Sequence, residues 1–420
     1  MERVFNEKRL SNRDNLILTC FSVYCSLALF TNSAIGMVDK VKLVIDLFRI
    51  AIFFVFAVDV AIDVFTRKLK INYYLILFSV LALLMTIGSK HPHMIIYLLF
   101  ILELRKFDFR EVLKTALKSY FITFVYIIVL AIFKVFPNGS ALRITLSGKY
   151  LYRYQLGFQS GTLAPAYFMF MVLMFVVLKN VAASWVELGL LLSINVCLYF
   201  LTNTRFDFVL VCLLLLIVTT CKLLKNKVNV KINKEILKYC LIVLPCLFLL
   251  FNVILIVGYS QNFIGINGFS IFFKLNRMVS NRLLFTYQTI LTQKITFFGT
   301  DLNLTNVLFY PQSANLRTDL VLDSSYFLNL YRYGISGLII MITIYSLLIY
   351  KSFEKKHYWI CFALIFCAME GVIGPFMMDY NYNMFIFYIS SILFEDKREI
   401  GVFYEEWQRT KKCCYCCGDI

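Results

Sequence analysis

Apolar residues in this chain fall into long runs that are separated by polar connections. Two of these runs, Leu156–Leu178 and Tyr239–Tyr259, contain no charged residue at all. A run of about 18 or more mostly apolar residues is long enough to cross the hydrocarbon layer of a bilayer. Because the backbone must satisfy its own hydrogen bonds in lipid, such runs form helices there. The pattern therefore predicts a polytopic, all-α membrane protein.

The runs predict twelve transmembrane helices. They cover residues 15–36, 41–65, 72–89, 92–104, 119–136, 161–178, 184–202, 206–221, 237–258, 326–350, 357–374 and 381–394. Two connections are long, residues 137–160 and 260–325, and the second is the only one large enough for a small subdomain outside the membrane. We expect one transmembrane domain over residues 1–400 and a cytoplasmic tail over residues 401–420.

The second long connection contains an amphipathic pattern. Ser280 is placed to cap a helix that runs from Asn281 to about Lys294. Five apolar side chains recur on one face of this helix, namely Leu283, Leu284, Tyr287, Ile290 and Leu291. The pattern predicts a helix that lies on the membrane face or packs over the bundle.

The charge distribution predicts the orientation in the membrane. Hydrophobic residues make up 60% of the chain and charged residues 16%, yet the net charge is +17. With the N-terminus inside, the inner connections carry 27 Lys and Arg and the outer ones 11, although the outer ones include both long loops. This asymmetry is the positive-inside rule. The net charge is therefore explained by the orientation of the chain in the membrane and not by nucleic-acid binding. Both termini are predicted to be cytoplasmic.

Metal and cofactor chemistry is not favoured by the motifs. The three histidines, His91, His93 and His357, are too few and too dispersed for a typical zinc site. The sequence contains neither a Walker loop nor a dinucleotide fingerprint, and the outer loops hold no dense carboxylate cluster for a divalent cation. We expect no cofactor and no metal. For the cysteines at 413, 414, 416 and 417, acylation and metal binding are alternatives to the favoured interpretation, a reduced tail without a dedicated function.

The predicted helix over residues 41–65 carries four charged residues on one face. Asp46, Arg49, Asp59 and Asp63 fall within an arc of roughly 140° at about 100° per residue. Asp46 and Arg49 are i, i+3 neighbours that can neutralise each other. These residues fit either a proton path or a buried helix–helix pairing, and we favour the structural interpretation.

Basic residues on the outer side oppose the orientation rule. They include arginines at 143, 153, 205, 277, 282 and 317, with Arg332 further into the following helix. A guanidinium group binds phosphate or carboxylate through two hydrogen bonds. Taken singly, each arginine is better explained by solvation or by a salt bridge, for example to Asp301, Asp319 or Asp323. Several arginines converging on one outer cavity would form an anion site, with Glu370 and Asp379 as further candidates for a general base.

Four short motifs follow one another in a recognisable order. They are Arg153-Tyr154-Gln155-Leu156-Gly157-Phe158, Thr202-Asn203-Thr204-Arg205, Asn281-Arg282-Leu283 with Phe298-Gly299, and Asp323-Ser324-Ser325-Tyr326 with Gly334. In this order they resemble the Wzy-type O-antigen and capsular polysaccharide polymerases, a group that also contains the O-antigen ligases. Gln159-Ser160-Gly161 departs from the His-Pro-Asn often found in the family. The ligase branch usually has a histidine where this chain has Asp323, which favours the polymerase branch.

The resemblance implies a helical bundle like that of C-type glycosyltransferases. It implies transfer of a growing glycan from undecaprenyl diphosphate onto a lipid-linked repeat unit at the outer face of the bacterial plasma membrane. Membrane lipids, a flippase and a chain-length regulator would be partners. Arg153, Arg205, Arg277 and Arg282 are expected to hold the diphosphate.

The base and the class of activity remain open at the level of sequence. Asp323 is the first candidate for the general base and Glu370 the second, and for Asp323 a salt bridge or a helix cap is an equal alternative. The rival functions are a lipid-linked oligosaccharide flippase and a ligase-like glycosyltransferase. The 66 residues of Ser260–Ser325 speak against a flippase, since carriers tend to have short loops on both sides.

Overall fold

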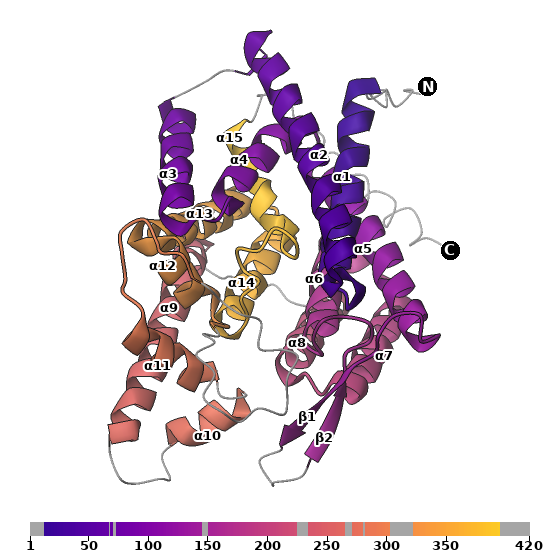
Figure 1. The fold of residues 1–420 in the computed structure, drawn as a ribbon, viewed down its shortest axis with the longest axis vertical. Coiled ribbons are helices and arrows are strands. Elements are labelled where there is room, and N and C mark those ends of the chain that lie inside the picture. Colours follow the sequence, from indigo (N-terminus) through magenta and orange to yellow (C-terminus); the bar gives the residue numbers. More distant parts are fainter. Residues whose placement is uncertain are drawn as a thin grey trace.

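The computed structural model describes residues 12–66, 68–69, 73–144, 150–224, 234–264, 271–279, 282–302 and 322–394. Among these residues, seven helices are long and apolar enough to cross a membrane. They are α1 (Asn12–Thr31), α5 (Phe109–Ile132), α6 (Leu163–Lys179), α7 (Trp185–Thr202), α8 (Arg205–Leu224), α9 (Lys234–Ile264) and α13 (Gly334–Glu354). The protein therefore has the helices of a multi-pass membrane protein (Figure 1).

Further helices are apolar but shorter, or carry more charge. The shorter ones are α3 (Tyr73–Ser89), α4 (His93–Leu104), α14 (Tyr358–Ile373) and the segment Met384–Leu393, which is a 3₁₀ turn over Met384–Phe387 followed by α15 (Tyr388–Leu393). Helix α2 (Asp39–Phe65) is 27 residues long and holds the four charged residues discussed above. Two single 3₁₀ turns, Ile35–Met37 and Asn180–Ala182, follow α1 and α6.

The prediction of one continuous helix over residues 326–350 was wrong. The structure has α12 (Ser325–Arg332) and α13, which are separated at Tyr333, directly before Gly334. Gly334 has φ 75° and Gly299 has φ 94°, and the two backbones lie so close that a Cβ on Gly334 would overlap the Phe297 carbonyl. Apolar periodicity continues through the break, so the pattern alone does not reveal it.

Replacing Gly334 with alanine is expected to destabilise the fold by more than about 2 kcal/mol, because a left-handed backbone costs an L-residue about 1–2 kcal/mol before any overlap is counted. Gly189 of α7 is the matched control, since an added Cβ meets nothing within 4 Å there. Alanine at Gly189 should be neutral or stabilise by about 0.5–1 kcal/mol. Thermal unfolding in detergent measures both, and equal shifts for the two variants would contradict the packing described here.

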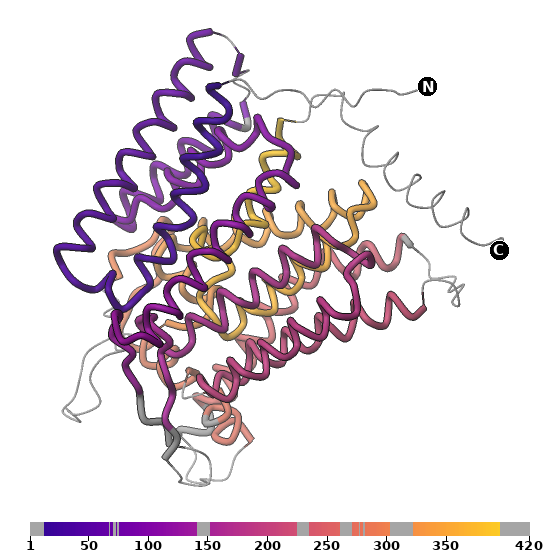
Figure 2. Tube along the Cα trace, turned by 90° about the vertical axis from the view of Figure 1, so that its right-hand side faces the viewer, coloured from indigo at the N-terminus to yellow at the C-terminus, as the bar shows by residue number. Residues whose placement is uncertain are grey.

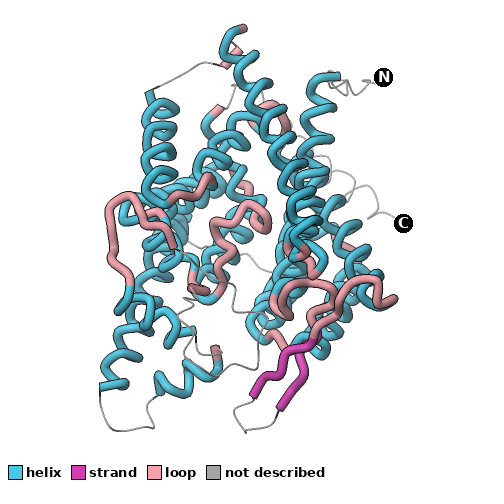
Figure 3. The backbone as a smooth tube through the Cα atoms, viewed as in Figure 1, coloured by secondary structure: helices cyan, strands magenta, loops and turns pink. Residues whose placement is uncertain are grey.

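The two long connections contain regular structure. Residues 137–160 include an antiparallel hairpin of β1 (Ser140–Ile144) and β2 (Tyr150–Tyr154), which the all-α prediction did not include (Figure 3). The connection after α9 contains α10 (Ile271–Met278) and α11 (Arg282–Thr292). Helix α11 confirms the predicted amphipathic helix, and it packs over the bundle because Leu283 is buried in one apolar cluster with Ile256 and Tyr259 of α9.

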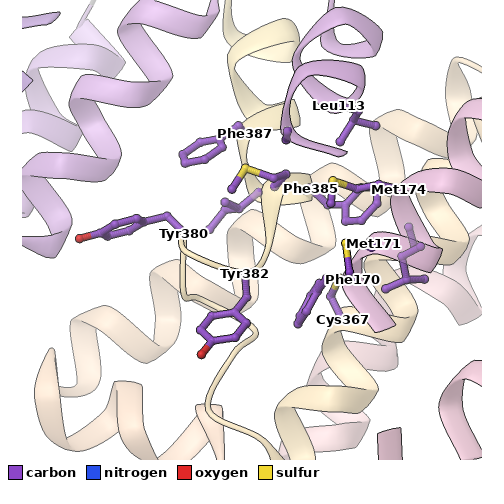
Figure 4. Close-up of a cluster of buried hydrophobic side chains, with 14 of the residues drawn as sticks. Leu113, Phe170, Met171, Met174, Cys367, Tyr380, Tyr382, Phe385 and Phe387 are labelled. Carbon is purple, nitrogen blue, oxygen red and sulfur yellow. The ribbon is translucent and has the colours of Figure 1, made fainter. Parts of the chain in front are cut away.

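The hairpin, α10 and α11 gather at one end of the bundle (Figure 1). Helices α1 and α2 lie along one edge (Figure 2), while α6 packs between α5, α7, α8 and α14 and is the most enclosed helix of the set. Figure 4 shows Phe170, Met171 and Met174 of α6 against Cys367, Tyr382 and Phe385. This core fixes the positions of the chain segments that form the sites described below.

Candidate functional site

Arg282 begins α11 and links three chain segments at the end of the bundle where the hairpin lies. Its Nε forms an ion pair with Asp323 Oδ2 at 3.0 Å, and its Nη1 donates to the backbone carbonyl of Ile373. Asp323 lies two residues before the start of α12, and Ile373 is the last residue of α14. A single guanidinium group therefore joins α11, α12 and α14.

Arg153 of β2 is held at the turn between α7 and α8. Its Nε donates to the Thr202 carbonyl at 2.7 Å and its Nη2 to Thr204 Oγ1 at 2.9 Å. Thr204 Oγ1 in turn donates to the Gly161 carbonyl at 3.1 Å. Asn203 ends α7 in the left-handed conformation, with φ 52°, which is a common way for a helix to end. The last carbonyls of a helix have no partner within it, and that of Thr202 is available to Arg153 for this reason.

Two buried carboxylates lie near Arg282, and one of them, Asp207, also interacts with Arg153. Asp207, in the first turn of α8, is 7% exposed, and Glu370, in the last turn of α14, is 1% exposed. Asp207 interacts electrostatically with both Arg282 and Arg153, and Glu370 interacts with Asp207, Arg282 and Asp323. We call Arg153, Asp207, Arg282, Asp323 and Glu370 the arginine–carboxylate cluster. It combines two guanidinium groups with three carboxylates from five separate chain segments.

Glu370 is held against the backbone of the segment that follows α14. It accepts a hydrogen bond from the Phe376 amide, and a Cβ on Gly374 would overlap its Oε1. Its Oε2 is buried and has no hydrogen-bond partner among the described residues. One oxygen of this carboxylate is thus fixed and the other is free to accept a proton or a hydrogen bond.

The structure brings some of the predicted site residues together and leaves others apart. Arg153, Arg282, Asp323 and Glu370 share the cluster. Arg205 is exposed at the start of α8 and has no ion pair with a described residue. Arg277 lies on α10, but its side chain, like those of Arg143 and Arg317, is outside the described part of the chain.

Asp323 forms a salt bridge, which was one of the sequence-based alternatives for this residue. Among the described residues its ion pair is made with Arg282, and Ser324 takes the N-cap position of α12, while Arg317 lies outside the described part of the chain. Asp207 was not among the predicted site residues. A carboxylate one residue inside a predicted transmembrane helix is costly unless it has a partner, so the sequence did contain a signal for it.

A second group of polar residues lies where α1, α2 and the segment 374–383 meet. Arg49 donates to the Tyr24 hydroxyl at 3.1 Å and to Asn381 Oδ1 at 3.3 Å. Asp379 Oδ1 accepts from both the amide and the side chain of Asn381, each at 2.8 Å. The expected Asp46–Arg49 pairing was wrong, since Arg49 turns towards Tyr24 and Asn381 instead.

Arg332, at the end of α12, faces the same group. Asp379 interacts electrostatically with Arg332 and Arg49, although within the described structure neither arginine forms an ion pair with it. The Nε atoms of both arginines are buried without a hydrogen-bond partner among the described residues. We call Arg49, Arg332, Asp379, Asn381 and Tyr24 the central polar cluster.

The short helix α4 and the connection before it lie beside the central polar cluster. Helix α4 has 12 residues, or about 18 Å, which is well below the ~30 Å of the hydrocarbon layer. It begins at His93, whose ring lies 5.3 Å from that of Tyr380. In the connection before it, burial and the neighbouring Arg332 guanidinium lower the pKa of the His91 imidazole. His91 is therefore neutral at pH 7 and adds no positive charge to the two arginines.

The C-terminal part of α2 forms a separate ion network through Asp59 and Asp63. Asp63 is paired with Arg13 at 2.8 Å, with Lys106 at 3.0 Å and with Arg105. Asp59 pairs with Arg13 and Lys106. The pairing of Asp59 and Asp63 with Arg13 of α1 is the helix–helix pairing that the structural interpretation predicted, while Arg105 and Lys106 lie in the turn after α4.

Comparison with protein-family models, with curated proteins and with solved structures gave no match at the level of significance applied. Within the described residues, no three His, Cys, Asp or Glu side chains are grouped so as to hold a metal ion.

Proposed function

We propose that this chain is a metal-independent membrane glycosyltransferase of the polysaccharide-polymerase type. It would transfer a growing glycan from undecaprenyl diphosphate onto a lipid-linked repeat unit at the outer face of the bacterial plasma membrane. A bundle of the C type with twelve spans is part of this proposal. The observation that supports it most is the arginine–carboxylate cluster, in which Arg153 and Arg282 reach one group of carboxylates from two separate loops.

The position of the cluster supports a reaction on the outer side. It lies at the end of the bundle where the hairpin, α10 and α11 gather (Figure 1). The positive-inside asymmetry assigns these connections to the outside. Lipid-linked repeat units that have already crossed the membrane would meet the protein at this end.

In the proposed reaction, a hydroxyl oxygen of the acceptor sugar attacks the anomeric carbon of the donor glycan. The bond from that carbon to the diphosphate oxygen breaks, and its electron pair leaves with undecaprenyl diphosphate. The proton of the attacking hydroxyl passes to a carboxylate of the protein. Arg153 and Arg282 offset the charge that grows on the leaving diphosphate, and a fixed donor of this kind contributes about 3–4 kcal/mol in a dry site.

The Arg282–Asp323 ion pair suggests how the base becomes available. An incoming diphosphate competes with Asp323 for the Arg282 guanidinium, which prefers a bidentate anion. Asp323 is then released to accept the proton of the acceptor hydroxyl. Glu370 is the second candidate for the base, because its Oε2 is already without a partner.

Replacing Arg153 with alanine tests the proposal in the host cell. We expect single lipid-linked repeat units to accumulate at the outer leaflet and long polysaccharide to be lost, because the diphosphate loses one of its two cations. Extracted lipids and the accessibility of their glycans from outside the cell measure this. Arg110→Ala is the matched control, since Arg110 also donates to a backbone carbonyl, that of Leu178, but at the other end of α6.

The central polar cluster favours a transporter as the second candidate. Carriers often bind their substrates at broken helices with charged residues at the break, and Arg332 lies directly before the α12–α13 break. If this alternative holds, Arg332→Ala and Arg153→Ala would both leave the repeat units at the inner leaflet. Accumulation at the outer leaflet in the Arg153 variant excludes it, while a ligase-like enzyme would be recognised by loss of the final transfer with polymer still present.

A further inference from the structure

An apolar pocket opens between α5 and α7, beside the hairpin. Its volume is about 440 Å³, which is within the ~300–1,000 Å³ of typical ligand sites. Apolar side chains from both helices form its walls, among them Ile132, Leu198 and Leu201. Ile132 is 66% exposed and Leu201 41%, so the pocket opens on the surface that a bilayer would cover.

The pocket shares two chain segments with the anchor of Arg153. Tyr154, which follows Arg153 directly, and Leu156, three positions after Arg153, line it. Leu201 lines it and precedes Thr202, whose carbonyl accepts from Arg153 Nε at 2.7 Å. A cationic group and an apolar pocket are therefore placed next to each other, at the end of the bundle where the arginine–carboxylate cluster lies.

We propose that this pocket holds the isoprene units of a polyprenyl diphosphate that lie nearest to the diphosphate. The inference rests on the proposed function and adds to it the place where the lipid chain lies. The anionic head of such a lipid meets Arg153 while its chain enters the pocket from the bilayer. Head and chain are joined directly in a polyprenyl diphosphate, which matches the adjacency of the guanidinium group and the apolar walls.

A membrane phospholipid is the competing occupant, because it also combines a phosphate with apolar chains. A phospholipid carries two chains on a glycerol that separates them from the phosphate. The pocket is one space between two helices, and its walls begin at the residue next to Arg153. A single chain attached to the anion itself fits this arrangement better.

Filling the pocket tests the inference. Cys197 of α7 lines the pocket and is exposed, and Cys240 of α9 is also exposed but lies outside it. The full-length protein, Cys197→Trp and Cys240→Trp are placed in phosphatidylcholine nanodiscs, with empty nanodiscs as background. The dissociation constants of farnesyl diphosphate and of inorganic pyrophosphate are then measured for each.

The wild type and Cys240→Trp are expected to bind farnesyl diphosphate at least tenfold more tightly than pyrophosphate, or by about 1.4 kcal/mol. In Cys197→Trp this preference should fall below threefold while the affinity for pyrophosphate is unchanged. The inference is overturned if Cys197→Trp keeps the preference, if Cys240→Trp loses it equally, or if dioctanoyl phosphatidylglycerol competes as well as farnesyl diphosphate.

Failure of the proposed function gives a different result. If pyrophosphate does not bind, and Arg153→Ala leaves the affinity for farnesyl diphosphate unchanged, the anion site is wrong. A loss of farnesyl diphosphate binding in Cys197→Trp would still support the pocket as the site of the isoprene chain in that case.

Discussion

Alanine in place of Arg282 is expected to lower polymer formation by at least about 100-fold, which corresponds to the roughly 3–4 kcal/mol contributed by a fixed donor at a developing anion. The variant should still insert and accumulate, because Asp323, which forms the ion pair with Arg282, is partly exposed and water can solvate its carboxylate. Long polysaccharide in whole cells and transfer by the purified protein measure the loss.

Lysine at position 282 should restore little of this activity. The guanidinium group donates to the Ile373 carbonyl and pairs with Asp323 through separate nitrogens. An ammonium group is a single point of charge and lacks the planar fork needed to bind a diphosphate through two bonds. Arg110→Ala again serves as the control, and full-length polymer from the Arg282→Ala variant would remove this residue from the site.

Replacing Asp63 with asparagine is expected to destabilise the protein by about 3–5 kcal/mol, the usual cost of removing one partner from a buried ion network. Asp63 faces three cations, and its side chain is only 4% exposed. Loss of its charge leaves Arg105 without an ion pair among the described residues, while Arg13 keeps Asp59 and Lys106 keeps Asp59 and Glu103. Thermal unfolding in detergent measures the change in stability.

Asp46→Asn is the matched control on the same helix. Asp46 is partly exposed and forms no ion pair within the described part of the chain, so its replacement should change stability by no more than about 0.5 kcal/mol. The activity per folded molecule of Asp63→Asn should equal that of the wild type. A variant that folds normally but loses activity would instead support the proton path that was the alternative for this face of α2.

Local patterns predicted most of the helices of this chain. The amphipathic helix after α9 could be predicted because its apolar residues repeat every three to four positions, and α11 follows that pattern from Arg282 to Thr292. The β1–β2 hairpin and the break at Gly334 could not be predicted in the same way. The hairpin pairs strands of only five residues each, which are too short to give a pattern as clear as that of a helix. The break depends on the approach of Gly299 and Phe297, which no periodicity encodes.

For the candidate site, too, the sequence predicted some features and not others. Residue chemistry and membrane sidedness indicated that arginines such as Arg153 and Arg282 oppose the orientation rule and suit an anion. They did not distinguish Arg205, which stays exposed, from Arg282, nor did they indicate Asp207. Which groups meet depends on where the C-terminal ends of α7 and α14 and the N-terminal ends of α8 and α11 lie relative to one another.

From the sequence by itself, the membrane class, the positions of most helices and the predicted sidedness of the loops follow, because hydrophobicity and charge act on each segment separately. Only the tertiary structure decided which cations face which carboxylates. Electrostatic and hydrogen-bonding interactions of this kind act over a few ångströms in space, and residues that are 129 positions apart, such as Arg153 and Arg282, come to share Asp207 only after the helices have packed.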